Sequence, residues 1–180
     1  LAADLNTIDA NTTAVVNAGA VVTSITGSVA EFATLITTNA ATTTLAVNYA
    51  ATITGGATVA QANVVDADTS GVVTATISDG DMATLANLTG DNNAYTVTVT
   101  DTSVDAAALN TLDGKTTVNV VATAATTLTG TAAAIATAIS AATIDTAANV
   151  GVTVDNGAVT AANLNTIDAN TGAVVDASAV

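Results

Sequence analysis

The segment LNTIDANT occupies residues 5–12 and recurs, letter for letter, at residues 164–171. Two related segments lie between them, NVVDADT at residues 63–69 and NTLDGKT at residues 110–116. A segment that recurs along a chain is typical of repeat proteins, in which each repeat completes its core against its neighbours. The recurrence therefore decides which fold class the sequence predicts.

The recurring segment divides the chain into seven repeats, aligned on the Leu that begins LNTID or on the residue that replaces it. Their approximate bounds are 1–27, 28–56, 57–80, 81–103, 104–130, 131–157 and 158–180. The first, third, fifth and seventh repeats, called odd repeats here, carry the pattern N-[TV]-[ILV]-D-[AG]-x-T, called the odd motif. The even repeats lack it. Repeats of about 26 residues are thus paired into a super-repeat of about 53 residues.

Each repeat carries the signals of a short helix and of a strand. Glu31 and Gln61 each lie three residues after a Ser or Thr and complete a capping box. Alternating apolar and polar residues follow the helices, as in Val73–Ile77 and Val150–Val154, and this alternation predicts β-strands. Six repeats carry, four residues before the aligned position, a residue that can cap a helix N-terminus: Ser28, Thr58, Asp81, Asp105, Thr131 and Thr160.

One short helix and one strand cannot bury a core alone, so the repeats are expected to pack on one another with parallel strands. The predicted fold is a repeat solenoid: a parallel β-solenoid with one short capped helix per repeat, or α/β solenoid, formed as a single segment by residues 1–180. Whether one repeat or a pair of repeats makes one turn is left open. Both terminal repeats are ordinary odd repeats without a protective cap. We therefore interpret the chain as part of a longer chain or polymer, with other copies or further repeats as end-to-end partners.

The composition limits the classes of function. The formal charge is −14, with one Lys and neither Arg nor His, so nucleic acid is not an expected partner, because phosphate contacts need basic side chains. No apolar stretch reaches the roughly 18 residues that a membrane span needs. The usual acid–base groups His and Cys are absent and only three residues are aromatic, so neither an enzyme nor catalytic residues are expected. Hydrophobic residues make up 50% of the chain, which indicates a folded protein.

The Asp of the odd motif has two interpretations. It can accept backbone N–H bonds in a local turn that the Thr three residues later braces. Alternatively, carboxylates on neighbouring repeats can share calcium. The segment DADTSG at residues 66–71 matches the start of a calcium loop, although Ile77 at its twelfth position excludes an EF-hand. The predicted calcium ligands are Asp66, Asp68, Asp79 and Asp81.

Two segments of the even repeats, ITGSVAEFATLI at residues 25–36 and LTGTAAAIATAI at residues 128–139, add to the odd motif. With them, the whole chain resembles large secreted repeat proteins of cyanobacteria and marine bacteria that carry runs of the LNTIDANTTG-AVDASAVTTITG type. The resemblance implies an extracellular or cell-surface repeat protein, of the surface-layer or hemolysin-type calcium-binding sort. The GGxGxD nonapeptides of calcium-binding β-rolls are absent, so their calcium stoichiometry is not carried over.

The sequence therefore predicts a non-catalytic structural segment of an extracellular or cell-surface filament, surface layer or adhesin stalk. A calcium-stabilised surface adhesin module is one alternative. An ice-binding protein is another, because TATIS at residues 74–78 and TVTVTDT at residues 96–102 can present Thr side chains on one face of a strand.

Overall fold

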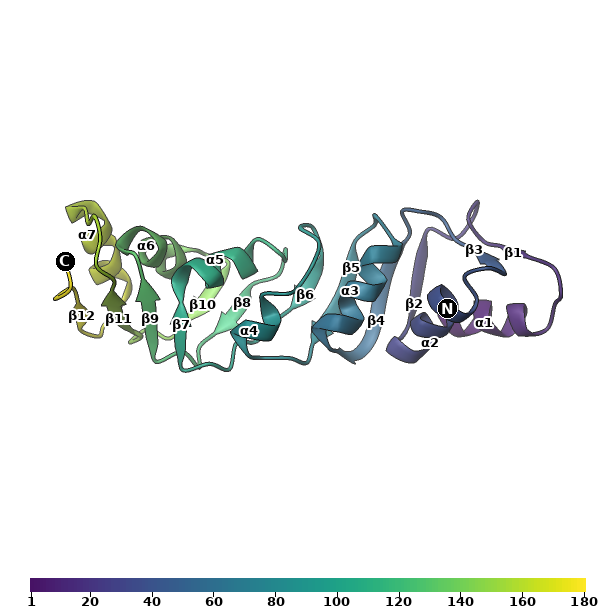
Figure 1. Cartoon of the computed structure of the whole chain (residues 1–180), viewed down its shortest axis with the longest axis horizontal. Coiled ribbons are helices and arrows are strands. Elements are labelled where there is room, and N and C mark those ends of the chain that lie inside the picture. Colours follow the sequence, from purple (N-terminus) through teal and green to yellow (C-terminus); the bar gives the residue numbers. More distant parts are fainter. The chain divides into compact units, whose positions relative to one another are not determined.

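The computed structural model describes residues 1–180 and contains seven α-helices, one in each repeat. Each of the six predicted N-cap side chains accepts a hydrogen bond from the backbone N–H three residues later, so these six predictions are confirmed. A π-helical turn, Thr34–Thr38, continues α2. The helices are α1 (Ala2–Ala10), α2 (Val29–Ala33), α3 (Val59–Asp68), α4 (Met82–Leu85), α5 (Ala106–Asp113), α6 (Ala132–Ser140) and α7 (Ala161–Asn170), labelled in Figure 1.

Twelve short strands form four separate parallel sheets. The sheet orders are β1-β3, β2-β4-β5-β6, β10-β8 and β12-β11-β9-β7. The strands are β1 (Val16–Asn17), β2 (Ser24–Ser28), β3 (Thr43–Thr44), β4 (Ala50–Ala57), β5 (Val73–Ile77), β6 (Ala94–Thr96), β7 (Ser103–Asp105), β8 (Val120–Ala122), β9 (Thr127–Gly130), β10 (Ile144–Thr146), β11 (Gly151–Val154) and β12 (Val175–Asp176).

The prediction of a single repeat solenoid is wrong. The chain has an α/β fold with four separate parallel sheets, and it divides into two compact units. The first compact unit comprises Leu1–Ser78 and Leu88–Tyr95, and the second comprises Asp79–Asn87 and Thr96–Val180. In a single solenoid a sheet runs through all the repeats, whereas here the sheet β2-β4-β5-β6 lies within residues 24–96 and the sheet β12-β11-β9-β7 within residues 103–176.

The fifth repeat shows why the sheets are separate. Its strands β8 and β9 are divided by the turn at residues 123–126, and β8 pairs with β10 whereas β9 pairs with β7 and β11. The strand partners also lie about one repeat apart along the chain, since Thr127 pairs with Ser103 and with Gly151. The predicted super-repeat of about 53 residues is therefore not a pairing distance in the sheets.

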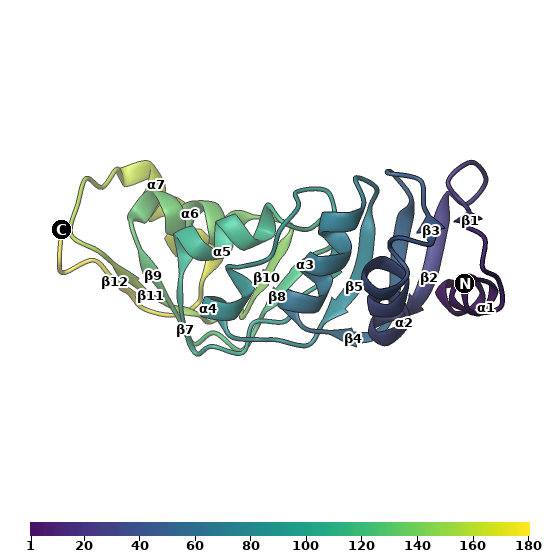
Figure 2. The same cartoon turned by 45° about the vertical axis from the view of Figure 1, so that its right-hand side comes forward.

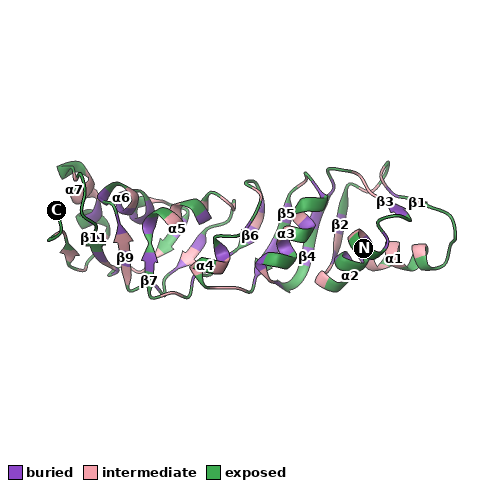
Figure 3. Cartoon of the chain, viewed as in Figure 1, coloured by how far each residue is buried: buried purple, intermediate pink, exposed green.

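Each compact unit has its own core. In the first unit, α2 and α3 pack on the β2-β4-β5 part of one sheet, and the aromatic side chains Phe32, Tyr49 and Tyr95 are fully buried. In the second unit, α5 and α6 pack on each other and on the sheet that contains β9, around Leu109 and Ile135. Figure 2 shows these helices along their sheets, and Figure 3 shows the alternation of buried and exposed positions on the strands.

Candidate functional site

The odd motif lies at the C-terminal part of a helix and in the turn that follows it. Its Asn and Asp belong to α1, α3, α5 and α7, and its Thr follows the helix in each case. In all four odd repeats the Thr hydroxyl accepts the backbone N–H two residues later, at 3.0–3.1 Å. This bond closes a local turn. The prediction that the Thr braces the turn is confirmed for Thr12, Thr69, Thr116 and Thr171.

Two of these threonines also bond to the preceding even repeat. The Thr69 hydroxyl donates to the backbone carbonyl of Tyr49, and the Thr171 hydroxyl donates to that of Val150 at 2.6 Å. Gly71 completes the first of these junctions. A Cβ at Gly71 would lie only 2.3 Å from the Tyr49 carbonyl oxygen, so no larger residue fits there without a backbone shift. The Thr end of the odd motif thus faces backward along the chain.

The Asp of the odd motif bonds to the following even repeat rather than to its own turn. In three odd repeats its carboxylate accepts a hydrogen bond from a Thr hydroxyl of that repeat. These donors offset the unfavourable position of an anion at a helix C-terminus. The predicted local turn is therefore made by the Thr and not by the Asp. The pairs are Thr43 with Asp9 (3.1 Å), Thr89 with Asp66 (2.6 Å) and Thr143 with Asp113 (2.8 Å).

The Asn of the odd motif also reaches the following even repeat. The amide of Asn6 donates to the carbonyl of Glu31, and the amide of Asn110 donates to the carbonyl of Ala134, both at 3.0 Å. Asn63 instead accepts the backbone N–H of Thr89 at 3.0 Å. At these junctions Asn and Asp thus face the following repeat, while Thr69 and Thr171 face the preceding one, and all of their partners lie in even repeats. This arrangement agrees with the occurrence of the motif in alternate repeats.

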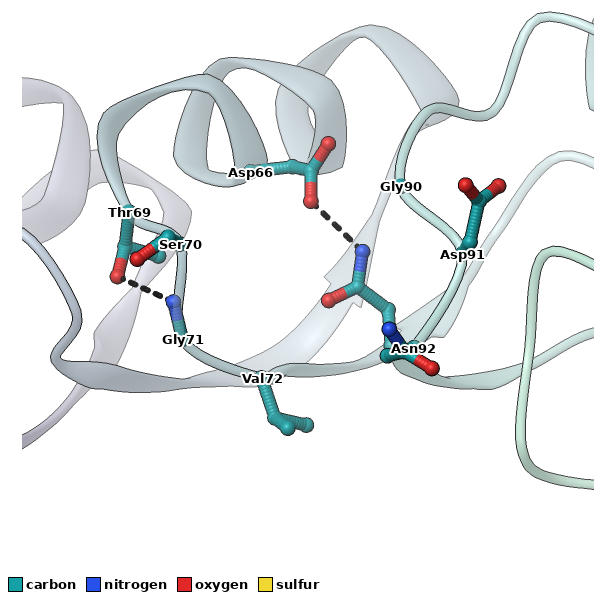
Figure 4. Close-up of a pocket in the computed structure, with 9 residues that line it drawn as sticks. Asp66, Thr69, Ser70, Gly71, Val72, Gly90, Asp91 and Asn92 are labelled. Atoms are coloured by element: carbon teal, nitrogen blue, oxygen red, sulfur yellow. Dashed lines mark hydrogen bonds between the residues drawn. The ribbon is translucent and has the colours of Figure 1, made fainter.

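A polar hollow of the first compact unit lies where α3 meets the loop at residues 88–95. It has a volume of about 220 Å³ and is shown in Figure 4. Asn93, only 3% exposed, holds it together: its amide donates to Asp66 at 2.7 Å and to the Tyr95 hydroxyl at 3.0 Å, and its carbonyl oxygen accepts the N–H of Val73. The hollow is lined by Asp66, Thr69, Ser70, Gly71, Val72, Gly90, Asp91, Asn92 and Asn93.

Burial and nearby carboxylates change the acidity of both tyrosines. Burial raises the pKa of Tyr49, and its 2.8 Å hydrogen bond to Asp68 raises that pKa further. Burial likewise raises the pKa of Tyr95, with a second contribution from the charge of Asp66. Both hydroxyls are therefore neutral donors or acceptors at ordinary pH. Both side chains are fully buried.

The four predicted calcium ligands already have protein partners. Asp66 accepts two side-chain bonds and Asp68 accepts the Tyr49 hydroxyl. Asp81 caps α4 through the N–H of Thr84, and this bond lowers the pKa of its carboxyl group. Asp79 is half-buried and also has a partner. Asp66 and Asp68 belong to the first compact unit, whereas Asp79 and Asp81 belong to the second.

The carboxylates of the chain are not grouped as a calcium site requires. No group of three or more His, Cys, Asp or Glu side chains is arranged to hold a metal ion, although calcium takes six to eight oxygens. One buried carboxylate oxygen, Oδ1 of Asp113, has no hydrogen-bond partner, but a single oxygen does not make a coordination shell. The carboxylates of Asp9, Asp66 and Asp113 meet neutral Thr or Asn donors instead of each other, so these three need no cation between them. Calcium binding stays a prediction.

Which Thr and Asn residues hydrogen-bond to the Asp of the odd motif was not predicted from the sequence. Thr89 lies four residues after the aligned Leu85, at the position that the motif Asp occupies in odd repeats, and this match in position is a usable signal. Thr43 and Thr143 lie at other positions of their repeats, because the loops that carry them differ in length.

Comparison with protein families, with curated proteins and with solved structures finds no match for this chain. No helix combines the length and the apolar character that crossing a membrane requires.

Proposed function

We propose that the chain is a non-catalytic structural segment of an extracellular or cell-surface assembly, such as a filament, a surface layer or an adhesin stalk. The observation that carries the proposal is the use of the odd motif. Its recurring polar side chains, which in a binding protein would face a ligand, bond instead to the neighbouring repeats. The most regular chemistry of the sequence thus serves to join repeats.

The surface charge suits the same role. A formal charge of −14 on 180 residues keeps a protein soluble and discourages random association. The bonds between repeats are mostly made by neutral side chains and backbone groups, or by a carboxylate with a neutral donor, so salt screens them weakly compared with exposed ion pairs.

Immunogold electron microscopy of native cells with an antibody to this chain tests the proposal. We expect label outside the cell envelope, on filaments, on a layer or on stalks, and mass spectrometry of the shed fraction should recover the polypeptide. Label confined to the cell interior, or recovery of the chain with a turnover activity, would contradict a structural role at the surface.

A second candidate, ice binding, is favoured by one surface of the first compact unit. Thr26, Thr52 and Thr74 are aligned in register across β2, β4 and β5, and Thr54 and Thr76 are exposed on the same strands. On strands about 4.8 Å apart, with same-face residues about 6.7 Å apart, these side chains place hydroxyl and methyl groups on one face of the sheet. The register between β4 and β5 shifts after Thr52, so the aligned row is that of Thr26, Thr52 and Thr74. Thermal hysteresis that is abolished by Thr52→Lys would support ice binding, and its absence in the parent protein would exclude it.

A further inference from the structure

In the seventh repeat, the Asn and Asp of the odd motif do not contact a following even repeat as they do in the other odd repeats. In α1, α3 and α5 the Asn and Asp of the motif are half-buried and bonded to the next even repeat. In α7 the corresponding Asn165 and Asp168 are exposed, and neither side chain makes a hydrogen bond. The Asn and Asp of the motif are therefore hydrogen-bonded in three odd repeats and not hydrogen-bonded in the seventh repeat.

The strand that follows α7 also has one edge without a strand partner. In the first and fifth repeats, the corresponding strands β1 and β8 pair in parallel with β3 and β10, which belong to even repeats. In the seventh repeat, β12 pairs with β11 on one side and forms the edge of its sheet on the other. Val174, directly before β12, is 83% exposed. An edge strand of this kind is a template for another strand.

We infer that the surface formed by α7 and β12, called the α7 surface, binds a repeat of the even type. The partner is specified by the chemistry at the three satisfied junctions. It presents a backbone group to Asn165, a Thr hydroxyl to Asp168 and a short parallel strand to the free edge of β12. The inference names a partner for the proposed structural role and rests on it, but its test in solution does not depend on where the protein acts.

The even repeat fits this surface better than a second odd repeat does. The junction of the fifth and sixth repeats supplies the template, because there the Ala134 carbonyl meets Asn110 and the Thr143 hydroxyl meets Asp113. Every junction at which the motif Asn and Asp are bonded has an even repeat as the partner, so the structure offers no template for an odd one. The sixth repeat also carries only two acidic residues, Asp145 and Asp155, so its approach to an acidic surface meets little repulsion.

The test extends residues 1–180 by a copy of residues 126–157 after Val180, so that the copied Thr143 follows Asp168 by 30 residues, as Thr143 follows Asp113. Hydrogen exchange of α7 and β12 is measured with and without the extension. We expect exchange in both elements to slow about tenfold or more, since one hydrogen bond to a charged group contributes roughly that factor. Circular dichroism should show the added helix.

Two matched variants separate specific docking from simple lengthening. In the extended protein, Asp168→Ala, or Val in place of the copied Thr143, should remove most of the added protection, whereas Asp168→Ala in the parent chain should leave exchange unchanged. An extension that stays unfolded, or one that protects α7 equally in all variants, would overturn the inference. A failure of the surface-localisation experiment with this result intact would reject the proposed function alone.

Discussion

Replacement of Asp66 by Ala is the most direct test of the bonds that join repeats. The Asp66 carboxylate accepts the Thr89 hydroxyl at 2.6 Å and the Asn93 amide at 2.7 Å. A hydrogen bond to a charged group contributes about 1.5–3 kcal/mol, and the lower value applies here because Asp66 is only half-buried and Thr89 is exposed. Two such bonds predict a loss of about 3 kcal/mol from the free energy of unfolding.

Urea unfolding provides the assay. With a slope of about 2 kcal/mol/M, this loss moves the midpoint down by roughly 1.5 M. Tyrosine fluorescence follows the first compact unit, because both tyrosines, Tyr49 and Tyr95, lie in it and the chain has no Trp. Far-UV circular dichroism follows the whole chain.

The matched control is Asp168→Ala, which changes the same motif position where the side chain is exposed and unbonded. It should move the free energy of unfolding by less than about 0.5 kcal/mol. Equal effects of the two substitutions, or a loss below about 1 kcal/mol for Asp66→Ala, would refute the reasoning that these carboxylates join repeats.

Three further outcomes are expected. The pKa values of Tyr49 and Tyr95 are raised in the folded protein, so their contribution to stability is present in full below the unfolded-state pKa of about 10. That contribution is lost as pH rises through the folded-state pKa values. Replacement of both tyrosines by Phe should therefore reduce the fall in the free energy of unfolding at alkaline pH, measured by urea unfolding across a pH series. Gly90→Ala should destabilise the first compact unit by at least 1 kcal/mol in urea, because φ is +75° and a Cβ would lie 2.2 Å from a side-chain nitrogen; a neutral result would mean that the loop adjusts freely. The calcium hypothesis predicts that calorimetric titration of metal-stripped protein shows binding at millimolar concentration or tighter, weakened by Asp66→Asn with Asp68→Asn, and a flat titration would remove it.

The helix starts were predictable because capping is local. Ser28 and Thr58 each bond to a residue three positions later, and their partners Glu31 and Gln61 are visible in the sequence beside them. The turn role of the motif Thr is equally local, since its hydroxyl receives an N–H two residues away.

The sheet arrangement and the partners of the motif Asp were not predictable in the same way. The strands are short and rich in Val, Thr and Ala, so alternation marks where a strand lies but not which neighbour it pairs with. The separation between the bonded Thr and Asp is 34, 23 and 30 residues at the three junctions, so no fixed spacing reveals the pairs. The motif was evident in the sequence, whereas its partners depend on loops of unequal length.

The forward and backward bonds of the odd motif also constrain how such a gene can change in length. Loss of the third and fourth repeats together, residues 57–103, would join the second repeat to the fifth and restore an even-to-odd junction of the existing kind. Loss of the fourth alone would place the third repeat directly before the fifth, and Asn63 and Asp66 would lose the Thr89 that now receives them. Unequal recombination should therefore add or remove repeats two at a time, and natural length variants of this sequence should differ by whole pairs.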